Sequence, residues 1–214
     1  MKYKAVIFDL DGVICYTDRY HYLAWKQIAD REGIYFDERI NDRLRGVSRM
    51  QSLEIILEKA DRAYSEEEKR ALAEEKNQAY REFLVQMTPG DLPEEIKKVL
   101  QTLKKAKIRM AIGSSSKNTK LILKQIGLEN FFDAVSDGTN ITHSKPDPEV
   151  FVKAAAMLNL PPKDCVVVED AGAGVEAAYR GGFASVGIGE AARAPKVTYP
   201  LRSIGGLPAI LFQE

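Results

Sequence analysis

The stretch that most constrains the fold is an apolar run that ends on two carboxylates. Residues 5–8 (Ala-Val-Ile-Phe) include two β-branched side chains and are typical of a buried strand. Asp9 and Asp11 follow this run, with Gly12 directly after them. Carboxylates at positions i and i+2 project to the same side of an extended chain, and an unpaired buried carboxylate is costly. This strand end is therefore expected to hold a divalent cation and a phosphate, unless the two aspartates only shape a turn before Gly12.

The pattern after this strand divides the chain into two parts. Residues 14–87 show helical spacing and no strand pattern, and breaker residues fill 88–93. Strand and helix patterns then alternate as far as residue 188, which is typical of a parallel sheet covered on both faces. We predict an α/β core domain of residues 1–13 and 88–214, with an all-helical domain of residues 14–87 inserted after the first strand.

Several elements of the core follow from this alternation. Strands are expected at 109–113, 132–136, 165–168 and 184–188, the last of these being the final strand, and a short tail is expected to pack on the core after residue 190. Helices are expected at 94–106, 117–126 and 175–180, with another that Asp147 caps and Pro148 opens at its first helical position.

The inserted part carries two capping-box signatures. Ser48 with Gln51, and Ser65 with Glu68, have the spacing that begins a helix, and the second helix is predicted to reach about residue 87. Asp18 is predicted to cap an earlier helix.

Lys76 lies on the apolar stripe of the second of these helices. Its ammonium either snorkels at the edge of the stripe or points into a cleft, and its position on the stripe favours the edge.

Charge and cysteine usage narrow the classes of partner. The 31 basic and 31 acidic residues cancel, which gives no support for nucleic acid or an anionic membrane as a partner. No apolar run is long enough to span a bilayer, and the first residues lead straight into a strand rather than a signal sequence. Cys15 and Cys165 are interpreted as free thiols in a reducing cytoplasm. A monomer is the default expectation.

Polar groups follow two later strands of the predicted sheet. Residues 114–116 are three serines that open a helix, where hydroxyls and free N–H groups can hold phosphate oxygens. Glu169 and Asp170 follow the fourth strand, and Lys145 precedes a helix start. Singly, these features are ordinary caps, loops and solvated side chains. Together, at the ends of strands in one sheet, they indicate a phosphate and metal site.

Magnesium suits this set because it prefers oxygen ligands and is usually held by one or two carboxylates with substrate phosphate. Asp9, Asp170 and a backbone carbonyl near Asp11 are the candidate ligands.

The same residues resemble the four motifs of the haloacid dehalogenase superfamily of phosphotransferases. Residues 8–13 are similar to the first motif, Ser114 to the second, Lys145-Pro146 to the third and Glu169-Asp170 to the fourth. The motifs occur in the expected order and cover the whole core. The resemblance implies a Rossmann-like parallel-sheet core with an inserted helical cap domain.

The resemblance also implies a role for each motif residue. Asp9 is the nucleophile that becomes an aspartyl phosphate, and Asp11 is the general acid and base. Ser114 and Lys145 complete the implied catalytic set, Lys145 by stabilising charge on the transferring group. The implied Mg²⁺ ligands are Asp9, Asp11 through its carbonyl, Glu169 and Asp170.

The insert resembles the cap of β-phosphoglucomutases. Residues 45–49 (Arg-Gly-Val-Ser-Arg), with Ser52 one turn on, are similar to the phosphate-binding stretch of that family, and His21 is implied to restrain hydrolysis until a sugar phosphate closes the cap. The candidate substrate-binding residues are Thr17, His21, Trp25, Arg45, Gly46, Val47, Ser48, Arg49, Ser52, Lys76, Ser115, Ser116, Lys117 and Asn118.

Arg49 indicates a second phosphate site independently of the family resemblance. It lies at a predicted helix N-terminus, which favours an anion, and its guanidinium is a permanently charged fork. A mutase needs a site for the phosphoryl group in transfer and another for the group that stays, whereas a phosphatase needs only the first. The ordinary alternative is a surface arginine.

The resemblance implies a magnesium-dependent mutase that interconverts β-D-glucose 1-phosphate and D-glucose 6-phosphate through glucose 1,6-bisphosphate. A sugar-phosphate or phosphoglycolate phosphatase on the same scaffold is the first alternative. A second alternative is an aspartyl-phosphate receiver module, which needs Asp9 but has no use for Asp11 as an acid. A structural protein fits least, because charged strand ends in one cleft oppose stability.

Overall fold

The computed structural model describes residues 2–44 and 47–212, and the chain divides into two compact units. The first unit contains the chain up to Tyr16 and from Thr88 onward, and the second contains Thr17–Met87. The first boundary between the units lies after Tyr16, whereas the sequence predicts it after Val13. Within the described residues, no helix combines the length and the apolar character that crossing a membrane requires.

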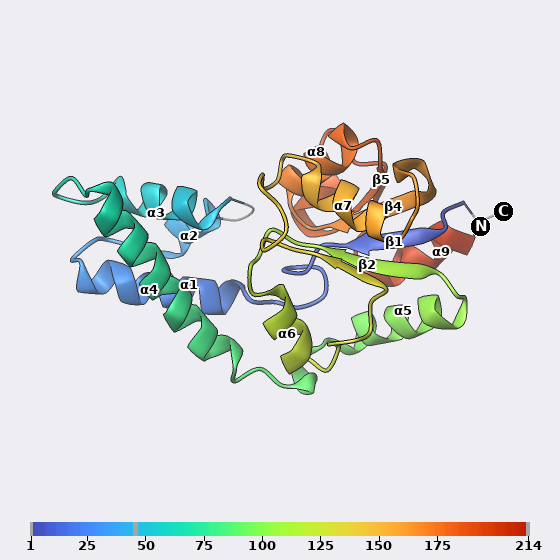
Figure 1. Cartoon of the computed structure of the whole chain (residues 1–214), viewed down its shortest axis with the longest axis horizontal. Coiled ribbons are helices and arrows are strands. Elements are labelled where there is room, and N and C mark those ends of the chain that lie inside the picture. The colour runs from blue at the N-terminus through green and yellow to red at the C-terminus, as the bar shows by residue number, and fades with distance from the viewer. Residues whose placement is uncertain (1, 45–46, 213–214) are drawn as a thin grey trace. The chain divides into compact units, whose positions relative to one another are not determined.

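A parallel sheet forms the centre of the first unit (Figure 1). In the described residues it has six strands in the order β3-β2-β1-β4-β5-β6. Their bounds are Ala5–Phe8 (β1), Arg109–Gly113 (β2), Ala134–Ser136 (β3), Cys165–Glu169 (β4), Ala184–Gly187 (β5) and Tyr199–Pro200 (β6). The predicted parallel sheet is confirmed, but β5 is not the last strand as expected. Strand β6 is too short for a periodic pattern, and its Pro200 suits an edge.

The register brings the strand ends together. Phe8 of β1 pairs with Ile112 of β2 on one side and with Val168 of β4 on the other. All four residues of β1 are fully buried, as expected for a central strand with both faces covered. The residues that follow β1, β2 and β4 therefore lie at one edge of the sheet.

Helices cover both faces of this sheet. Their bounds are Glu94–Lys105 (α5), Thr119–Gln125 (α6), Glu149–Met157 (α7), Gly172–Arg180 (α8) and Leu207–Phe212 (α9). Figure 1 shows α7 and α8 on one face of the sheet, with α5 and α9 on the other. On the first of these faces, Ile7 and Val167 pack against Phe151 of α7 and Ala177 of α8 in one apolar cluster. Short 3-10 turns lie at Pro89–Asp91, Pro162–Asp164, Gly189–Arg193 and Ile204–Gly206.

The core helices α7 and α8 differ in how well the sequence predicts where they begin. The Asp147 carboxylate accepts a hydrogen bond from the Glu149 N–H at 2.9 Å, as expected of a helix cap followed by proline, and Pro148 already has helical dihedrals, although α7 itself begins one residue later, at Glu149. Helix α8 begins at Gly172 rather than Val175, so the glycine-rich stretch that weakens a helix pattern is itself helical.

The second unit is a bundle of helices with its own core. Their bounds are Asp18–Arg31 (α1), Glu38–Asp42 (α2), Arg49–Leu57 (α3) and Glu66–Leu84 (α4). Trp25, Phe36, Leu53 and Leu72 belong to one apolar cluster that spans α1, α3, α4 and the α1–α2 connection.

Both predicted capping boxes are confirmed. The Ser48 hydroxyl accepts from the Gln51 N–H and the Gln51 side chain accepts from the Ser48 N–H, and Ser65 and Glu68 make the same pair of bonds. The prediction for Asp18 is wrong, because Thr17 occupies the N-cap position and Asp18 is the first helical residue.

Candidate active site

A buried ion-pair cluster lies where β1 and β4 end. Asp9 follows β1, and its N–H donates to the Val168 carbonyl of β4 at 2.9 Å. The Lys145 Nζ lies 2.5 Å from Asp9 Oδ1 and 2.5 Å from Glu169 Oε1. Asp9 is 7% exposed and Glu169 is 1% exposed. The register of β1 with β4 brings Asp9 and Glu169 together, and the loop before α7 brings Lys145 into contact with both.

The start of α8 positions the Glu169 carboxylate. Its Oε2 accepts hydrogen bonds from the N–H groups of Asp170 and Ala171, both at 3.1 Å, and its Oε1 accepts from Lys145. These N–H groups lie at the positive end of the helix dipole. A Cβ atom at Gly174 would lie 1.8 Å from Glu169 Oε1, so only a glycine leaves room for the carboxylate here.

A second glycine allows the two strand ends to approach closely. Gly12 has φ +84°, a conformation that glycine adopts readily, and a Cβ atom there would lie 2.0 Å from Asp170 Oδ2. The loop after β1 therefore lies against the Asp170 carboxylate, and Asp11 stands directly before this contact in the chain.

Burial and like charge shift the pKa values of this cluster. Burial raises the pKa of Glu169 to about 7, with the Asp9 charge adding to the rise and Lys145 opposing it. Burial, then the charges of Asp9 and Glu169, raise the pKa of Asp170 to about 8. Burial lowers the pKa of Lys145, but the neighbouring Asp9 and Glu169 outweigh it, so the pKa is raised and the ammonium stays charged.

The carboxylates exceed the charge that Lys145 supplies, and this excess fits a divalent cation. One oxygen each from Asp9, Glu169 and Asp170 lie within 4.8 Å of one another. These are hard oxygen donors, which suit Mg²⁺ or a similar ion. Such an ion would offset the repulsion that raises the pKa of Asp170.

The serine loop after β2 is held by its own hydroxyls. Ser114 is buried, and its Oγ accepts from the Ser116 N–H at 3.1 Å, while Ser116 Oγ accepts from the Asn118 N–H at 3.2 Å. The Ser115 hydroxyl is buried and has no hydrogen-bond partner among the described residues. Each of the two bonded serines accepts, so its own O–H stays available to donate to an anion.

Helix α6 begins at Thr119 rather than at Lys117 as predicted. Asn118 is the buried N-cap residue and Lys117 is exposed. The local hydrogen bonds of the serines extend the loop by two residues, because they compete with the helix for backbone N–H groups.

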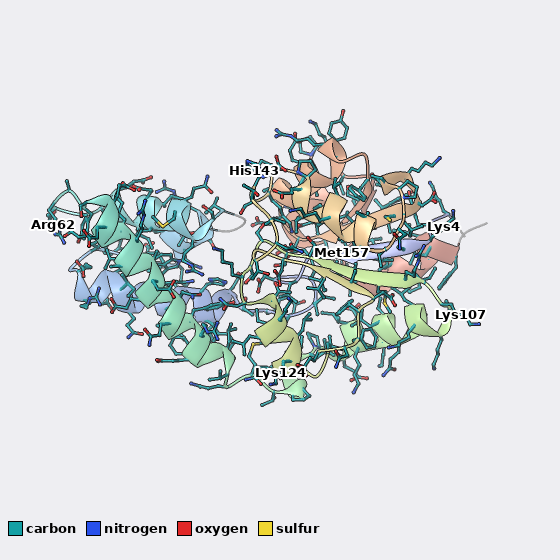
Figure 2. The ribbon with its side chains drawn as sticks, viewed as in Figure 1. Lys4, Arg62, Lys107, Lys124, His143 and Met157 are labelled. Carbon is teal, nitrogen blue, oxygen red and sulfur yellow. The ribbon has the colours of Figure 1, made fainter. Side chains whose placement is uncertain are left out.

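Hydrogen bonds to Glu149, together with an ion pair, hold the loop that carries Lys145 in place. Glu149 accepts from the N–H groups of Thr142 at 2.9 Å and His143 at 2.7 Å, and its other oxygen lies 2.6 Å from Lys153. His143, labelled in Figure 2, is itself exposed. Together with Asp147 and Glu149 it forms a second cluster of possible metal ligands, but the bonds to Glu149 explain it as a loop anchor.

In the second unit, Lys76 is buried rather than at the edge of its stripe. Only 3% of it is exposed, and its Nζ lies 2.7 Å from His21 Nδ1. The ammonium also lies over the rings of Trp25 and Tyr80, at 5.0 and 4.5 Å from their centroids. Cation–π attraction to these rings stabilises the buried ammonium. The position of Lys76 on the apolar stripe does not reveal these contacts.

This contact fixes the state of His21. Burial lowers the pKa of His21 well below its ordinary value, and the charges of Lys76 and Arg49 lower it further. Because the Lys76 ammonium can only donate, Nδ1 accepts and the proton of the neutral ring lies on Nε2.

Arg49 is the first residue of α3. Its guanidinium donates to Asn77 Oδ1 at 2.8 Å and lies 3.3 Å from Glu74 of α4, and 28% of its side chain is exposed. Ser52, one turn on, is buried, and Val47 is exposed. A half-buried arginine at a helix N-terminus can still bind an anion.

Three further residues of the predicted cap site are Thr17, Arg45 and Gly46. Thr17 is fully buried at the N-cap of α1. Arg45 and Gly46 lie outside the described residues.

Sequence reasoning missed Asp137. It follows β3 at the same edge of the sheet, is 1% exposed, and accepts from the Thr139 N–H at 2.9 Å through Oδ1. Its Oδ2 is buried without a partner in the described part of the chain. The signal was present, because Asp137 comes directly after the strand predicted to end at Ser136, as the other site residues follow theirs.

Comparisons with known proteins agree with this fold. The model of the haloacid dehalogenase-like hydrolases matches residues 3–182. The chain is 44% identical to the β-phosphoglucomutase of Bacillus subtilis over 87% of this chain and 84% of that protein. It is 32% identical to the phosphorylated carbohydrates phosphatase of Thermotoga maritima over 84% of this chain and 82% of that one.

A solved structure also matches almost the full length. The crystal structure of β-phosphoglucomutase from Clostridium difficile aligns with a TM-score of 0.89 and 38% identity, covering 98% of this chain and 96% of the other. The motifs, the sheet and these relatives together show that the chain belongs to the haloacid dehalogenase-like hydrolase family.

Proposed function

We propose that this protein is a β-phosphoglucomutase, which interconverts β-D-glucose 1-phosphate and D-glucose 6-phosphate. The main structural support for phosphoryl transfer is the buried contact of Lys145 with Asp9 and Glu169, which lies beside Asp170. The choice of a mutase is supported by 44% identity to a β-phosphoglucomutase over 87% of this chain.

Asp9 is the nucleophile in this proposal. In the phosphorylated enzyme, its phosphoryl group passes to the C6 oxygen of β-glucose 1-phosphate, and Asp11 takes the proton of that hydroxyl. The glucose 1,6-bisphosphate so formed then returns the phosphoryl group from its C1 oxygen to Asp9, and Asp11 gives the proton back to that oxygen. One carboxylate thus carries the group and another carries the proton.

Lys145 and the serine loop stabilise the charge on the group in transfer. The Lys145 ammonium is held against Asp9 by Glu169, so it is already in place when a phosphoryl group reaches Asp9. The hydroxyls of Ser114 and Ser116 can donate to phosphate oxygens while they continue to accept from the backbone.

We assign the divalent cation of the site as Mg²⁺, held by Asp9, Asp170, the Asp11 carbonyl and Glu169. When bound, it supplies positive charge to the oxygens of the transferring phosphoryl group. The carboxylate excess of the cluster supports this assignment.

A mutase needs a second phosphate site, and the second unit offers a candidate. Arg49, at the N-terminus of α3, is proposed to bind the phosphate that stays on the sugar, together with Ser48 and Ser52. Asn77 and Glu74 orient the guanidinium from α4.

The test follows both products in one assay. With Mg²⁺, β-glucose 1-phosphate and a trace of glucose 1,6-bisphosphate, we expect glucose 6-phosphate with little free phosphate. The Asp9→Asn variant is expected to lose this activity, by at least about 10³-fold, because the nucleophile is gone. Free phosphate without glucose 6-phosphate would exclude the mutase.

The alternative is a sugar-phosphate phosphatase, which the similarity to the Thermotoga maritima phosphatase supports at 32% identity. Arg49→Ala separates the two. We expect it to reduce mutase activity by about 10²-fold or more, since a charged, partly buried phosphate contact is lost. Undiminished turnover of small phosphate esters by this variant, with phosphate as the main product of the wild type, would favour the phosphatase.

A further inference from the structure

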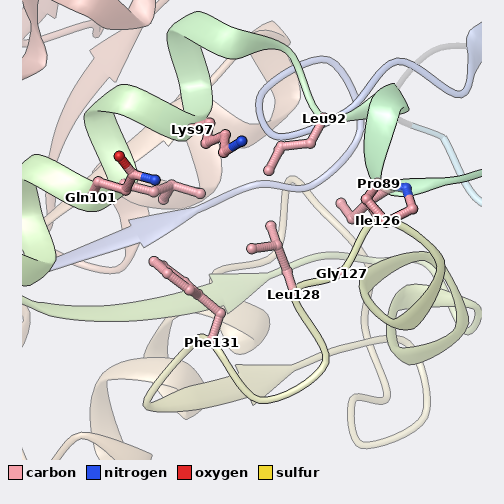
Figure 3. A pocket seen from close by; sticks show the side chains of 9 residues that line it. Pro89, Leu92, Lys97, Gln101, Ile126, Gly127, Leu128 and Phe131 are labelled. Atoms are coloured by element: carbon pink, nitrogen blue, oxygen red, sulfur yellow. The ribbon is translucent and has the colours of Figure 1, made fainter.

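A separate cavity lies on the first unit, beside α5 and away from the strand ends. Its volume is about 200 Å³, and Figure 3 shows its side chains at close range. Leu100 of α5, Leu92 of the segment before it, and Ile126, Leu128 and Phe131 of the segment after α6 supply an apolar lining. Nothing in the proposed phosphoryl transfer uses this cavity.

The lining is held in place by backbone geometry. Gly127 has φ +77°, and a Cβ atom there would lie 3.6 Å from both Cβ and Cγ of Pro89. The two segments that form opposite sides of the cavity therefore meet at this contact. Leu100, Ile126 and Leu128 are buried, so much of the lining belongs to the packed core and is already formed.

One side of the cavity is polar and cationic. Lys97 and Gln101 extend from successive turns of α5 along the cavity in Figure 3. Lys97 makes a surface ion pair with Glu94 at 4.0 Å, a distance at which such pairs contribute little. A second ammonium, that of Lys104, lies 4.2 Å from the centroid of the Phe131 ring. The charge beside the apolar lining therefore favours an anion.

We propose that this cavity binds a small amphipathic carboxylate with one ring as its apolar body. An enclosed, dry protein cavity of about 150 Å³ accepts benzene. This cavity is partly open to solvent, and its volume of about 200 Å³ has room for a single substituted ring whose carboxylate stays at the open side. The ring lies among Leu92, Leu128 and Phe131, and the carboxylate meets the Lys97 ammonium and the Gln101 amide. The proposal does not depend on the proposed mutase activity.

Phenylacetate is the probe, and phenylacetamide is its neutral counterpart of nearly equal shape. We expect saturable changes in the methyl NMR signals of Leu92, Ile126 and Leu128 in the wild-type protein, with phenylacetate binding about 2–5-fold more tightly than the amide. Absence of saturable shifts up to 50 mM probe overturns the proposal, and so do shifts at other methyl groups alone. Equal affinity for the two probes overturns the assignment of an anion.

Two variants with a matched control complete the test. Lys97→Gln is expected to abolish the preference for phenylacetate, whereas Lys98→Gln, an exposed neighbour on α5 that does not line the cavity, is expected to keep it. Leu92→Phe is expected to lower the affinity for both probes at least about 5-fold by filling the cavity. Leu92 is partly exposed, so the larger ring can be accommodated without unfolding. Unchanged binding in Lys97→Gln and Leu92→Phe would contradict the proposal.

Discussion

The Asp170 carboxylate shows how strongly its neighbours determine the behaviour of a single residue. Its pKa is raised from 3.8 to about 8 by burial and by Asp9 and Glu169, and the pKa of Glu169 is raised from 4.5 to about 7. In the metal-free protein the folded state therefore binds protons that the unfolded state releases. Stability from these groups is highest near pH 4 and falls as the pH rises toward about 8.

The metal-free protein in EDTA is accordingly expected to melt at a lower temperature at pH 8 than at pH 5.5. The difference should be at least about 4 °C, or roughly 1–2 kcal/mol for a chain of this size. Mg²⁺ is expected to reverse the loss, with an effect that grows with pH because it binds the ionised carboxylates. Thermal melts followed by circular dichroism at both pH values measure this. A Mg²⁺ effect that is equal at pH 5.5 and pH 8, or that persists in Asp170→Asn, would contradict it.

Single residues were predictable where the backbone dictates their place. Asp9 and Glu169 could be placed because each lies at the end of an apolar strand, and neighbouring parallel strands end at one edge of the sheet. The role of Lys76 could not be predicted, because the aromatic rings that stabilise its ammonium come partly from another helix. Similarly, no sequence pattern shows that the Asp137 Oδ2 lacks a partner, since that depends on every group around it.

At the scale of an element, α8 provides a matched pair of glycines. A Cβ at Gly174 meets Glu169 Oε1 at 1.8 Å, whereas nothing lies within 4 Å of a Cβ at Gly172. Gly174→Ala is expected to displace Glu169 from Lys145, lower kcat by about 10-fold or more and destabilise the protein by roughly 1–3 kcal/mol. Gly172→Ala is expected to keep both activity and stability.

Urea unfolding and the mutase assay on both glycine variants distinguish these outcomes. Equal behaviour of the two variants would show that the close approach of α8 to Glu169 does not matter for the site.

Helix α3 has a capping box that serves the proposed phosphate site. Ser48→Ala removes the bond to the Gln51 N–H and is expected to cost about 1 kcal/mol. Ser65→Ala removes the same bond at α4 and is expected to cost a similar amount. Only Ser48→Ala is expected to raise the KM for β-glucose 1-phosphate, by about 3-fold or more, because Ser48 both caps the helix that begins with Arg49 and is itself proposed to bind the phosphate. If both serine variants change KM alike in steady-state kinetics, the cap of α3 has no special role.

Elements with strong local signals were predicted well, and those that depend on tertiary contacts were not. The capping boxes of α3 and α4 are encoded within four residues each. Strand β6 forms because Tyr199 and Pro200 pair with β5, and two residues are too few to show a periodic pattern. The start of α7 was also predictable, because Asp147 accepts from the Glu149 N–H two residues later, as a cap followed by proline does.

For the whole molecule, separate cores in the two units predict separable unfolding. The single tryptophan, Trp25, is 2% exposed in the core of residues 17–87, so its fluorescence reports on that unit. Mg²⁺ is expected to raise the midpoint seen by circular dichroism, which both units contribute to, more than the midpoint seen by tryptophan fluorescence. Parallel urea titrations with and without Mg²⁺ test this. Coincident shifts in the two signals would show that the units unfold together.

The pairing of β1 with β4 also determines when the site can form during translation. Phe8 pairs with Val168, so the first strand leaves the ribosome long before this partner is made. At about 5–20 residues per second, the intervening chain takes roughly 8–32 s to synthesise. During that interval the apolar β1 can pair only with β2, while residues 17–87 already have everything needed for their own core. A nascent chain stopped before β4 therefore contains Asp9 and Lys145 without Glu169, so the buried ion-pair cluster can form only after residue 169 has been made.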